Sequence, residues 1–553
     1  MVKNDSMKKY INSMSSWPIP FVFCALFLIL RLPALHMPYH QDEYKWAMAV
    51  GFEDFFSASI PHPPLTRFLY LTLSLLIGND YLRLMPIIVS LITLWILFSY
   101  ANRFYSKRVA VIASTFFVLM PYSVLGSLQI DIDGAVLPLF TIITVYGYFL
   151  WKESGFKNLD KLAIVILGLL GGFLSKLSFV IVPVSLAVHW LYERYFADFK
   201  ISEVVTFIRL RYLWFIALLG ALPVLFWLSN HVFLFRYVKN FMHVGGRNYF
   251  ELFFLTAKAI IYLSPVLVIL PLIGIKKWKG VSFWYLFGII GILFYAVIFD
   301  FSHRTLDRYW AVMVLPLIMI SSVYLSEFIK SISKKDCVIL GVSTILITLS
   351  GMFIFGLKHL VLPLNPKADF IHALITLKWN ILIPISGGSG PVGFYLSLLG
   401  IVFFWALTVI AFVLLIKSRR EGALAVLAIF LSYSLIVNAE YLFGYFYGSS
   451  TQVLNTLVGE VRDNKGVVKV MDYNDSGAYE LIQMGKYYQR FYADPAFVES
   501  NKQKFDNFNG YFMVLDFPMI DKNSYYSQYL SNCKVEYQSS DKYIKGYIYN
   551  CTN

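Results

Sequence analysis

The chain has 553 residues, of which 58% are hydrophobic and 18% aromatic, while only 14% are charged. Soluble globular proteins carry about 25% charged residues, so this composition excludes an ordinary soluble protein. The formal net charge of +14 could suggest a nucleic-acid partner, but the Lys and Arg residues lie mostly in short gaps between apolar runs. That distribution is typical of the cytoplasmic loops of a polytopic membrane protein and disfavours nucleic-acid binding.

Apolar runs of about 20 residues, long enough to cross a bilayer, recur along residues 1–445 and predict about thirteen transmembrane helices. No small-residue cleavage site follows the first run, which we therefore expect to be retained. Every second gap is rich in Lys or Arg, which places the N-terminus in the cytoplasm and the other gaps outside. The expected spans lie at about 17–36, 81–100, 109–126, 134–151, two within 162–191, 212–229, five more before Lys417, and 423–445.

The polar C-terminal region, residues 446–553, differs from the rest of the chain. "GVVKVMDYND" and "GYFMVLDF" predict strands, and "SGAYELIQMG" predicts a helix with Ser476 as its N-cap. The last segment predicts a hairpin flanked by Cys533 and Cys551, which could pair outside the cytoplasm or remain two free thiols. The expected fold is an all-α polytopic membrane domain over residues 1–445 with a small extracytoplasmic α/β domain over residues 446–553.

Two adjacent acids, Asp42 and Glu43 in "HQDEYKWA", follow the first span directly. Acidic side chains at a membrane boundary are costly unless they are solvated or paired, so their position suggests a function. Asp42 could instead be a helix cap or an interfacial charge. Glu43 could be solvated, or could orient a partner that contacts the substrate.

A second predicted outer gap, "GSLQIDID", carries Asp131 and Asp133. One of the two could cap the following helix, so we expect a single functional acid among them. Lys176 lies in the tight turn between the fifth and sixth spans, where it could also be an interfacial anchor.

Further cations occupy other predicted outer gaps. "IPHPPLTR" contains His62 and Arg67, which are candidate phosphate ligands, although His62 could equally make a structural hydrogen bond. Its prolines predict a turn at the membrane surface. Arg304 and Arg308 are one helical turn apart and could clamp a phosphate together. They could equally pair with Asp307 or with lipid headgroups.

Transfer of a sugar from a lipid phosphate needs negatively and positively charged side chains in the same site. A carboxylate accepts the proton of the attacking hydroxyl, while Lys and Arg neutralise the charge that grows on the leaving phosphate. The outer His and Asp residues would also suit a divalent cation, although no tight ligand spacing appears. The alternative is a transporter or flippase of lipid-linked saccharides, which predicts internal repeats and charges near the bilayer midplane.

The order of these features over roughly residues 17–200 resembles the GT-C superfamily of integral-membrane glycosyltransferases, especially the protein O-mannosyltransferase and aminoarabinose-transferase-like families. The resemblance implies a polyprenyl-phosphate-linked sugar donor, an acceptor at the outer face of the plasma membrane, and inversion at the anomeric carbon. Asp42 matches the first-loop acid, the expected general base or acceptor-positioning carboxylate, and Asp131 or Asp133 matches the second-loop acid. Lys176 matches the turn lysine of the family.

His62 departs from one branch of this family. The aminoarabinose branch has Lys before the Pro-Pro pair, whereas His62 agrees better with the mannosyltransferase branch. The resemblance leaves the sugar open, and with it the acceptor, which could be a protein hydroxyl, a lipopolysaccharide-type glycolipid or another cell-envelope glycan.

Overall fold

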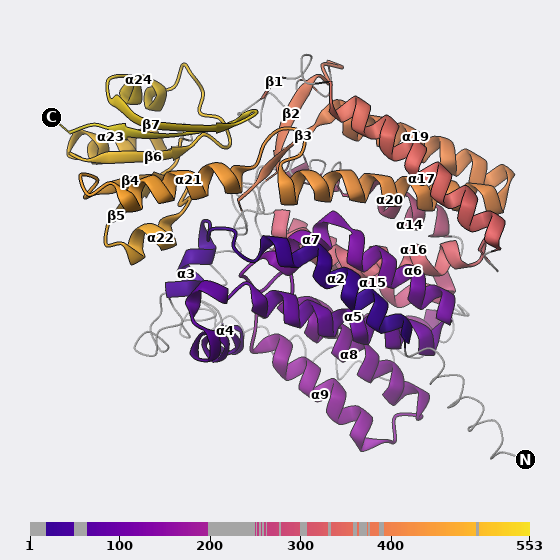
Figure 1. Cartoon of the computed structure of the whole chain (residues 1–553). Coiled ribbons are helices and arrows are strands. Elements are labelled where there is room, and N and C mark those ends of the chain that lie inside the picture. The colour runs from indigo at the N-terminus through magenta and orange to yellow at the C-terminus, as the bar shows by residue number, and fades with distance from the viewer. Residues whose placement is uncertain are drawn as a thin grey trace, which may run out of the picture.

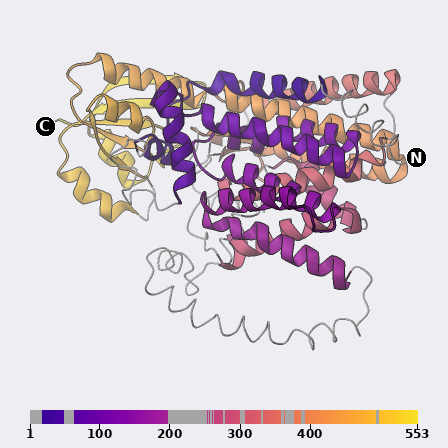
Figure 2. The same cartoon turned by 90° about the horizontal axis from the view of Figure 1, so that it is seen from below.

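The computed structural model describes residues 18–48, 63–196, 263–275, 278–298, 307–329, 333–357, 376–385, 392–493 and 497–552, with isolated positions between them. The expected span at 212–229 and the site candidates His62 and Arg304 lie outside these residues. The structure is mostly helical, with a small sheet near the C-terminus. In two views at right angles, the helices form a bundle and the C-terminal sheet lies at one end of it (Figures 1 and 2).

The first half of the bundle is built from helical hairpins. Ser106 caps α6 and Asn158 caps α9, each with its side-chain oxygen accepting a backbone N–H of the first turn. Pro121 occupies the first turn of α7, which bends by 61° from α6. These helices are α2 (Pro18–Arg31), α3 (Asp42–Met48), α4 (Pro64–Ile77), α5 (Leu84–Phe104), α6 (Lys107–Leu119), α7 (Pro121–Leu128), α8 (Val136–Glu153), α9 (Leu159–Phe173) and α10 (Ile181–Leu191).

The second half continues the bundle and adds a small three-stranded sheet. Its 3-10 segment Asp307–Met313, η7, leads directly into α16. The helices are α14 (Pro265–Gly274), α15 (Trp278–Leu293), α16 (Val314–Ser326), α17 (Lys334–Phe355), α19 (Leu398–Lys417) and α20 (Arg419–Phe443), and the strands are β1 (Leu362–Pro363), β2 (Ile381–Ile385) and β3 (Phe394–Ser397).

Six helices among the described residues are long and apolar enough to cross a membrane, or seven if the bent pair α6–α7 forms one span. Three more apolar helices are shorter, including α4, which lies in the predicted outer segment after the first span. The structure therefore agrees with a polytopic helical membrane protein, and the count of thirteen spans stays a prediction.

The C-terminal sheet unit, residues 446–553, contains a five-stranded sheet in the order β5-β4-β6-β8-β7. Strands β5, β4 and β6 are parallel, and β8 is antiparallel to both β6 and β7. Its elements are α21 (Ser450–Asp463), β4 (Val470–Tyr473), α22 (Ala478–Gln483), β5 (Tyr487–Phe491), α23 (Val498–Asp506), β6 (Tyr511–Leu515), α24 (Tyr525–Ser531), β7 (Lys534–Asp541) and β8 (Ile544–Asn550).

Most elements of this unit agree with the sequence prediction. The two predicted strands correspond to β4 and β6, the predicted helix to α22, and the hairpin to β7–β8. Cys533 and Cys551 form a disulfide across the open end of that hairpin, with Cα atoms 4.8 Å apart. The expectation that Ser476 caps the helix was wrong, because α22 begins after Gly477 in a left-handed conformation. Strand β5 was not predicted.

Candidate active site

A buried ion pair joins the segment after the first predicted span to the residue that precedes α5. Arg83, immediately before α5, donates from Nη1 and Nη2 to the two carboxylate oxygens of Glu43, at 2.7 and 3.1 Å. The same carboxylate accepts the backbone N–H groups of Ile130 and His40. Both charged side chains are fully buried. Glu43 is therefore not solvated, and it fixes α3 against the loop that carries the second pair of acids.

Asp42 starts α3 and is considerably more accessible than its neighbour. Its side chain is about one-third exposed and pairs with Lys45 on the next turn of the helix. Helix α3 lies at the end of the bundle that carries the C-terminal sheet (Figure 1), which we call the sheet end. Asp42 is thus an accessible carboxylate on a short helix whose other face is anchored by Glu43.

A second ion pair lies at the mouth of a small cavity. Lys176, in the turn after α9, donates from Nζ to both carboxylate oxygens of Asp133, at 2.8 and 2.6 Å. The ammonium group also lies 4.6 Å from the centre of the Tyr309 ring, a cation–π distance. Both charged side chains are largely buried. Asp133 and Lys176, predicted separately as the second-loop acid and the turn lysine, therefore form one ion pair.

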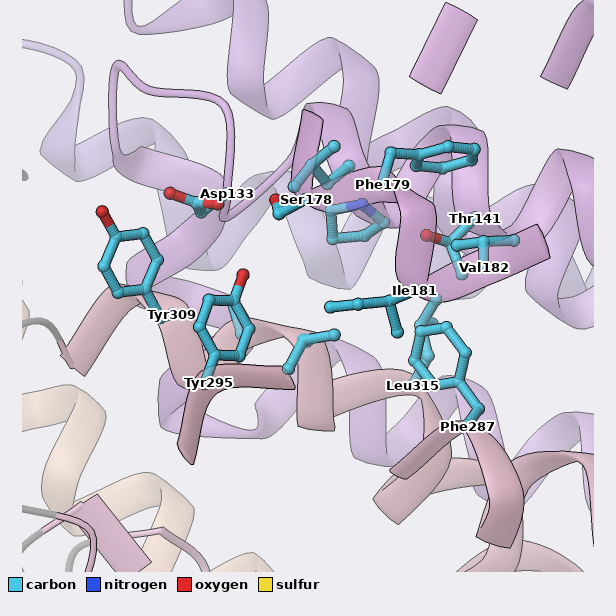
Figure 3. A pocket seen from close by; sticks show the side chains of 14 residues that line it. Asp133, Thr141, Ser178, Phe179, Ile181, Val182, Phe287, Tyr295, Tyr309 and Leu315 are labelled. Atoms are coloured by element: carbon cyan, nitrogen blue, oxygen red, sulfur yellow. The ribbon is translucent and has the colours of Figure 1, made fainter. Parts of the chain in front are cut away.

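The cavity has its charged group and both tyrosines at one end and is mostly apolar elsewhere. Figure 3 shows Asp133, Tyr295 and Tyr309 gathered at one end, with aliphatic and aromatic side chains and the hydroxyl groups of Ser178 and Thr141 along the remainder. Its volume is about 30 Å³, enough for one or two water molecules. The apolar walls come from α8, the 3-10 segment η3 (Leu177–Val180), α10, α15, η7 and α16, through Leu137, Pro138, Phe179, Ile181, Val182, Phe287, Ala311, Val312 and Leu315.

The structure separates the two acids of "DID". Asp133 lines the cavity, whereas Asp131 is buried outside it and its backbone carbonyl accepts the hydroxyl of Tyr70 at 3.1 Å. The expectation that one of them caps the next helix was wrong. The N-cap position of α8 is Ala135, and no side chain caps that helix.

Among the residues that the structure describes, none of the other predicted phosphate ligands lines the cavity. Arg67 is buried on α4 and is not one of the cavity-lining residues. The backbone of Arg308 belongs to η7, next to Tyr309, but its side chain lies outside what the structure describes, like all of His62 and Arg304. Their predicted roles therefore stay predictions.

Three residues of this region were not singled out from the sequence. Tyr295 and Tyr309 stack with ring centres 5.2 Å apart at the polar end of the cavity, but nothing distinguishes them among 38 tyrosines in the sequence. Arg83 did carry a signal, since it is a charged side chain within the first turn of the span predicted at 81–100. Within the described part of the chain, no group of three or more His, Cys, Asp or Glu side chains could hold a metal ion.

Comparison with known proteins agrees with this architecture. Residues 61–227 match the family model of the dolichyl-phosphate-mannose-protein mannosyltransferases. The apo structure of ArnT from Cupriavidus metallidurans aligns over 97% of this chain and 98% of its own, with a TM-score of 0.51 and 12% identity. The chain therefore shares the fold of ArnT, and its residues 61–227 are similar to the protein mannosyltransferases.

Two further GT-C structures are similar at lower scores. ArnT from Cupriavidus metallidurans bound to undecaprenyl phosphate aligns over the same 97% and 98% of the two chains, with 13% identity and a TM-score of 0.49. The Archaeoglobus fulgidus oligosaccharyltransferase tethered with an acceptor peptide gives 11% identity and a TM-score of 0.37, over 90% of this chain and 69% of its own. None of the curated proteins compared with the sequence matches it.

The family match covers only part of the candidate site. It includes Asp133 and Lys176 but begins after Asp42 and Glu43. The first-loop acids are therefore connected to the matched segment by their contacts, above all by the bond from the Ile130 amide to Glu43.

Proposed function

We propose that this protein is an inverting glycosyltransferase that passes a hexosyl or pentosyl group from a polyprenyl-phosphate-linked donor to an acceptor hydroxyl. The observation that carries the proposal is the Asp133 carboxylate at one end of a mostly apolar cavity, with Lys176 bound to it. A lipid phosphate needs both parts of this arrangement, a cation for the phosphate and an apolar wall for the first isoprene units. The family name of the matched segment, with its dolichyl-phosphate-linked sugar, supports the same donor class.

The donor phosphate would lie against Lys176, within reach of the Tyr309 hydroxyl. A charge-assisted bond from a largely buried ammonium is well suited to a leaving phosphate, because the surrounding apolar side chains weaken dielectric screening. Asp133 holds Lys176 in place before the donor arrives. Since the cavity now has room only for water, donor binding must move the lining side chains apart.

Asp42 would act as the base. Its carboxylate would accept the proton of the acceptor hydroxyl as the hydroxyl oxygen attacks the anomeric carbon. The bond from that carbon to the phosphate oxygen breaks, and the polyprenyl phosphate leaves with its charge against Lys176. A single displacement inverts the carbon and needs base and phosphate on opposite sides of the sugar. The origin of Asp42 and Lys176 in different outer loops supports this requirement.

The proposal assigns residues 1–445 to the membrane and places the C-terminal domain, residues 446–553, on the extracytoplasmic side of the plasma membrane, with the N-terminus in the cytoplasm. The disulfide between Cys533 and Cys551 supports that side, because disulfides persist in oxidising compartments. The sugar acceptor, whether a protein, a glycolipid or a polysaccharide, is met on this side.

The test is Asp42→Asn, measured as transfer of labelled sugar from polyprenyl-phosphate-linked mannose, and in parallel from the corresponding aminoarabinose donor, in membrane vesicles. Loss of the base should lower the rate by about 10²–10⁴-fold. Glu499→Gln is the matched control, because Glu499 is 85% exposed on α23 and should leave the rate unchanged. Full transfer by folded Asp42→Asn protein would contradict the proposed base, and label that crosses the membrane without transfer would instead indicate a flippase.

A further inference from the structure

The segment that carries Asp42 is held by the C-terminal sheet unit as well as by the membrane helices. The amide of Gln41 donates to the backbone carbonyl of Asp475 at 3.3 Å, and His40 forms an antiparallel bridge with Ser476. Rings also pair across the boundary. Tyr39 lies 4.9 Å from Tyr479, and Tyr44 lies 6.2 Å from Tyr487, measured between ring centres. Contacts thus run through residues 39–44, on both sides of Asp42.

The partner of this segment is the loop between β4 and α22. Asn474 and Asp475 have φ angles of 60° and 56°, and Gly477 has a φ angle of 85°. Left-handed conformations are unfavourable for most non-glycine residues and are best tolerated by Asn and Asp, which occupy these positions here. The loop follows the carboxyl end of β4, between neighbours β5 and β6. In open α/β sheets, ligands bind beyond the carboxyl ends of the strands, where neighbouring strands are connected in opposite directions. In this protein, the first outer loop packs at that position.

Asp475 is the centre of this contact. Its fully buried carboxylate accepts Arg490 Nη1 at 2.8 Å and the Tyr487 hydroxyl at 2.9 Å. Burial raises the pKa of Asp475, while the bonds from Arg490 and Tyr487 and the positive charge of nearby Lys45 oppose that rise. Lys45 is the residue that pairs with Asp42. Arg490 therefore pairs with Asp475, Lys45 pairs with Asp42, and the backbone bond from Gln41 to Asp475 joins the two pairs.

A buried apolar cluster also joins α3 to the C-terminal sheet unit. It contains Trp46 of α3, Tyr70 of α4, Ile130 of the second acidic loop and Tyr479 of α22, all buried. The Tyr479 hydroxyl also donates to Asp80, at the start of the second span, at 3.2 Å. A cluster with members from both parts of the chain fixes their relative position, because separating them would expose this apolar surface to water.

We infer that Asp475 and Arg490 of the C-terminal sheet unit are positioning residues for Asp42: they hold α3 and Lys45 so that the Asp42 carboxylate meets the acceptor hydroxyl in a fixed orientation. This inference rests on the proposed function. The C-terminal unit is then a working part of the active site, even though it touches neither the donor cavity nor the reacting atoms.

The experiment compares Arg490→Gln with Arg490→Lys and Tyr487→Phe in the full-length protein, by hydrogen exchange and by kinetics. Lys502→Gln is the control, because Lys502 pairs with Glu499 on the surface of the same unit. In Arg490→Gln, peptides covering residues 39–48 should exchange faster. Transfer from polyprenyl-phosphate-linked mannose should lose about 10²-fold in kcat, the effect of a misplaced catalytic group, with KM for the donor within twofold of wild type. Arg490→Lys should recover part of kcat, and Tyr487→Phe should give a smaller change in the same direction.

Unchanged exchange over residues 39–48, unchanged kcat, or an equal effect of Lys502→Gln would each overturn the inference. These results are distinct from failure of the proposed function, which would appear as absent transfer by the wild type or as full transfer by Asp42→Asn. The exchange measurement needs no substrate and tests the contact in either case.

Discussion

Lys176 is held by both oxygens of one carboxylate inside an apolar surrounding, and this determines how it can serve a lipid phosphate. Removing one partner of a buried ion pair leaves the other charge unpaired, which generally costs about 3–5 kcal/mol. A phosphate that reaches Lys176 supplies a replacement anion. The pair therefore keeps the ammonium charged and oriented while the donor is absent.

Replacing each partner separately should have opposite effects on donor binding. Lys176→Met should weaken binding of undecaprenyl phosphate by roughly 10- to 100-fold, since a hydrogen bond to a charged group contributes about 1.5–3 kcal/mol. Asp133→Asn should bind it at least as tightly as the wild type, because the phosphate no longer competes with a carboxylate for Lys176. Both effects can be measured as the rise in melting temperature caused by the lipid.

Lys157→Met is the control for this pair, because Lys157 is exposed in the gap between α8 and α9. It should bind undecaprenyl phosphate as the wild type does. Equal weakening in Lys176→Met and Asp133→Asn would contradict the view that Asp133 only positions the lysine.

At the scale of elements, the loop that presents Asp133 depends on one very close backbone approach. A Cβ atom added to Gly134 would lie 2.4 Å from the carbonyl oxygen of Gly126 in α7. No side chain fits there, so α7 and the start of α8 would have to separate. Since Asp133 is the adjacent residue, its carboxylate would move with the loop.

Gly134→Ala should therefore reduce both stability and donor binding. Overpacking typically costs about 1–3 kcal/mol, and the response to undecaprenyl phosphate should also weaken, because Lys176 would be displaced together with the Asp133 that binds it. Gly341→Ala is the matched control, because nothing lies within 4 Å of an added Cβ at this position in α17. Its melting temperature should equal or exceed that of the wild type. A Gly134→Ala protein with unchanged melting temperature and lipid response would show that the loop is freer than its contacts indicate.

The elements themselves were largely readable from the sequence, because apolar runs and basic gaps reflect local requirements of a bilayer. The sequence predictions were wrong where contacts between residues far apart in the sequence determine the local structure. Ser476 resembles a cap, yet it bridges to His40 of the first outer loop. Strand β5 reads "YYQRF", which lacks a clear alternation because its residues serve both the sheet and the contact with α3.

The sequence predicted which acidic and basic residues belong to the candidate site, but not which acid pairs with which cation. Glu43 and Arg83 are 40 residues apart, and Asp133 and Lys176 are 43 apart. No local spacing relates such partners, so the sequence could name the acids and most of the cations without assigning one to the other. Tyr309 contributes through its ring to Lys176, a role that belongs to the packing of η7 and is invisible in composition.

At the scale of the whole molecule, the orientation of the chain in the membrane determines whether the candidate site opens to the extracytoplasmic side, as the proposed reaction requires. The loops bearing Glu43 and Asp133 connect at the sheet end. Their helices α5 and α8 reach the opposite end of the bundle, where Arg103 and Glu153 form an exposed ion pair among the basic gaps. The positive-inside rule places that opposite end in the cytoplasm.

Labelling of single cysteines tests this orientation. In a protein with Cys24 and Cys337 replaced by Ser, a membrane-impermeant maleimide should label Lys502→Cys in intact spheroplasts, because Lys502 is an exposed residue of the C-terminal sheet unit. Arg103→Cys is equally exposed in the native pair and should react only after permeabilisation. Cys533 and Cys551 remain unreactive while their disulfide is intact. The reverse pattern would place the acids and the sheet on the cytoplasmic side, where the disulfide would meet reducing conditions, and would remove the basis for an extracytoplasmic transfer reaction.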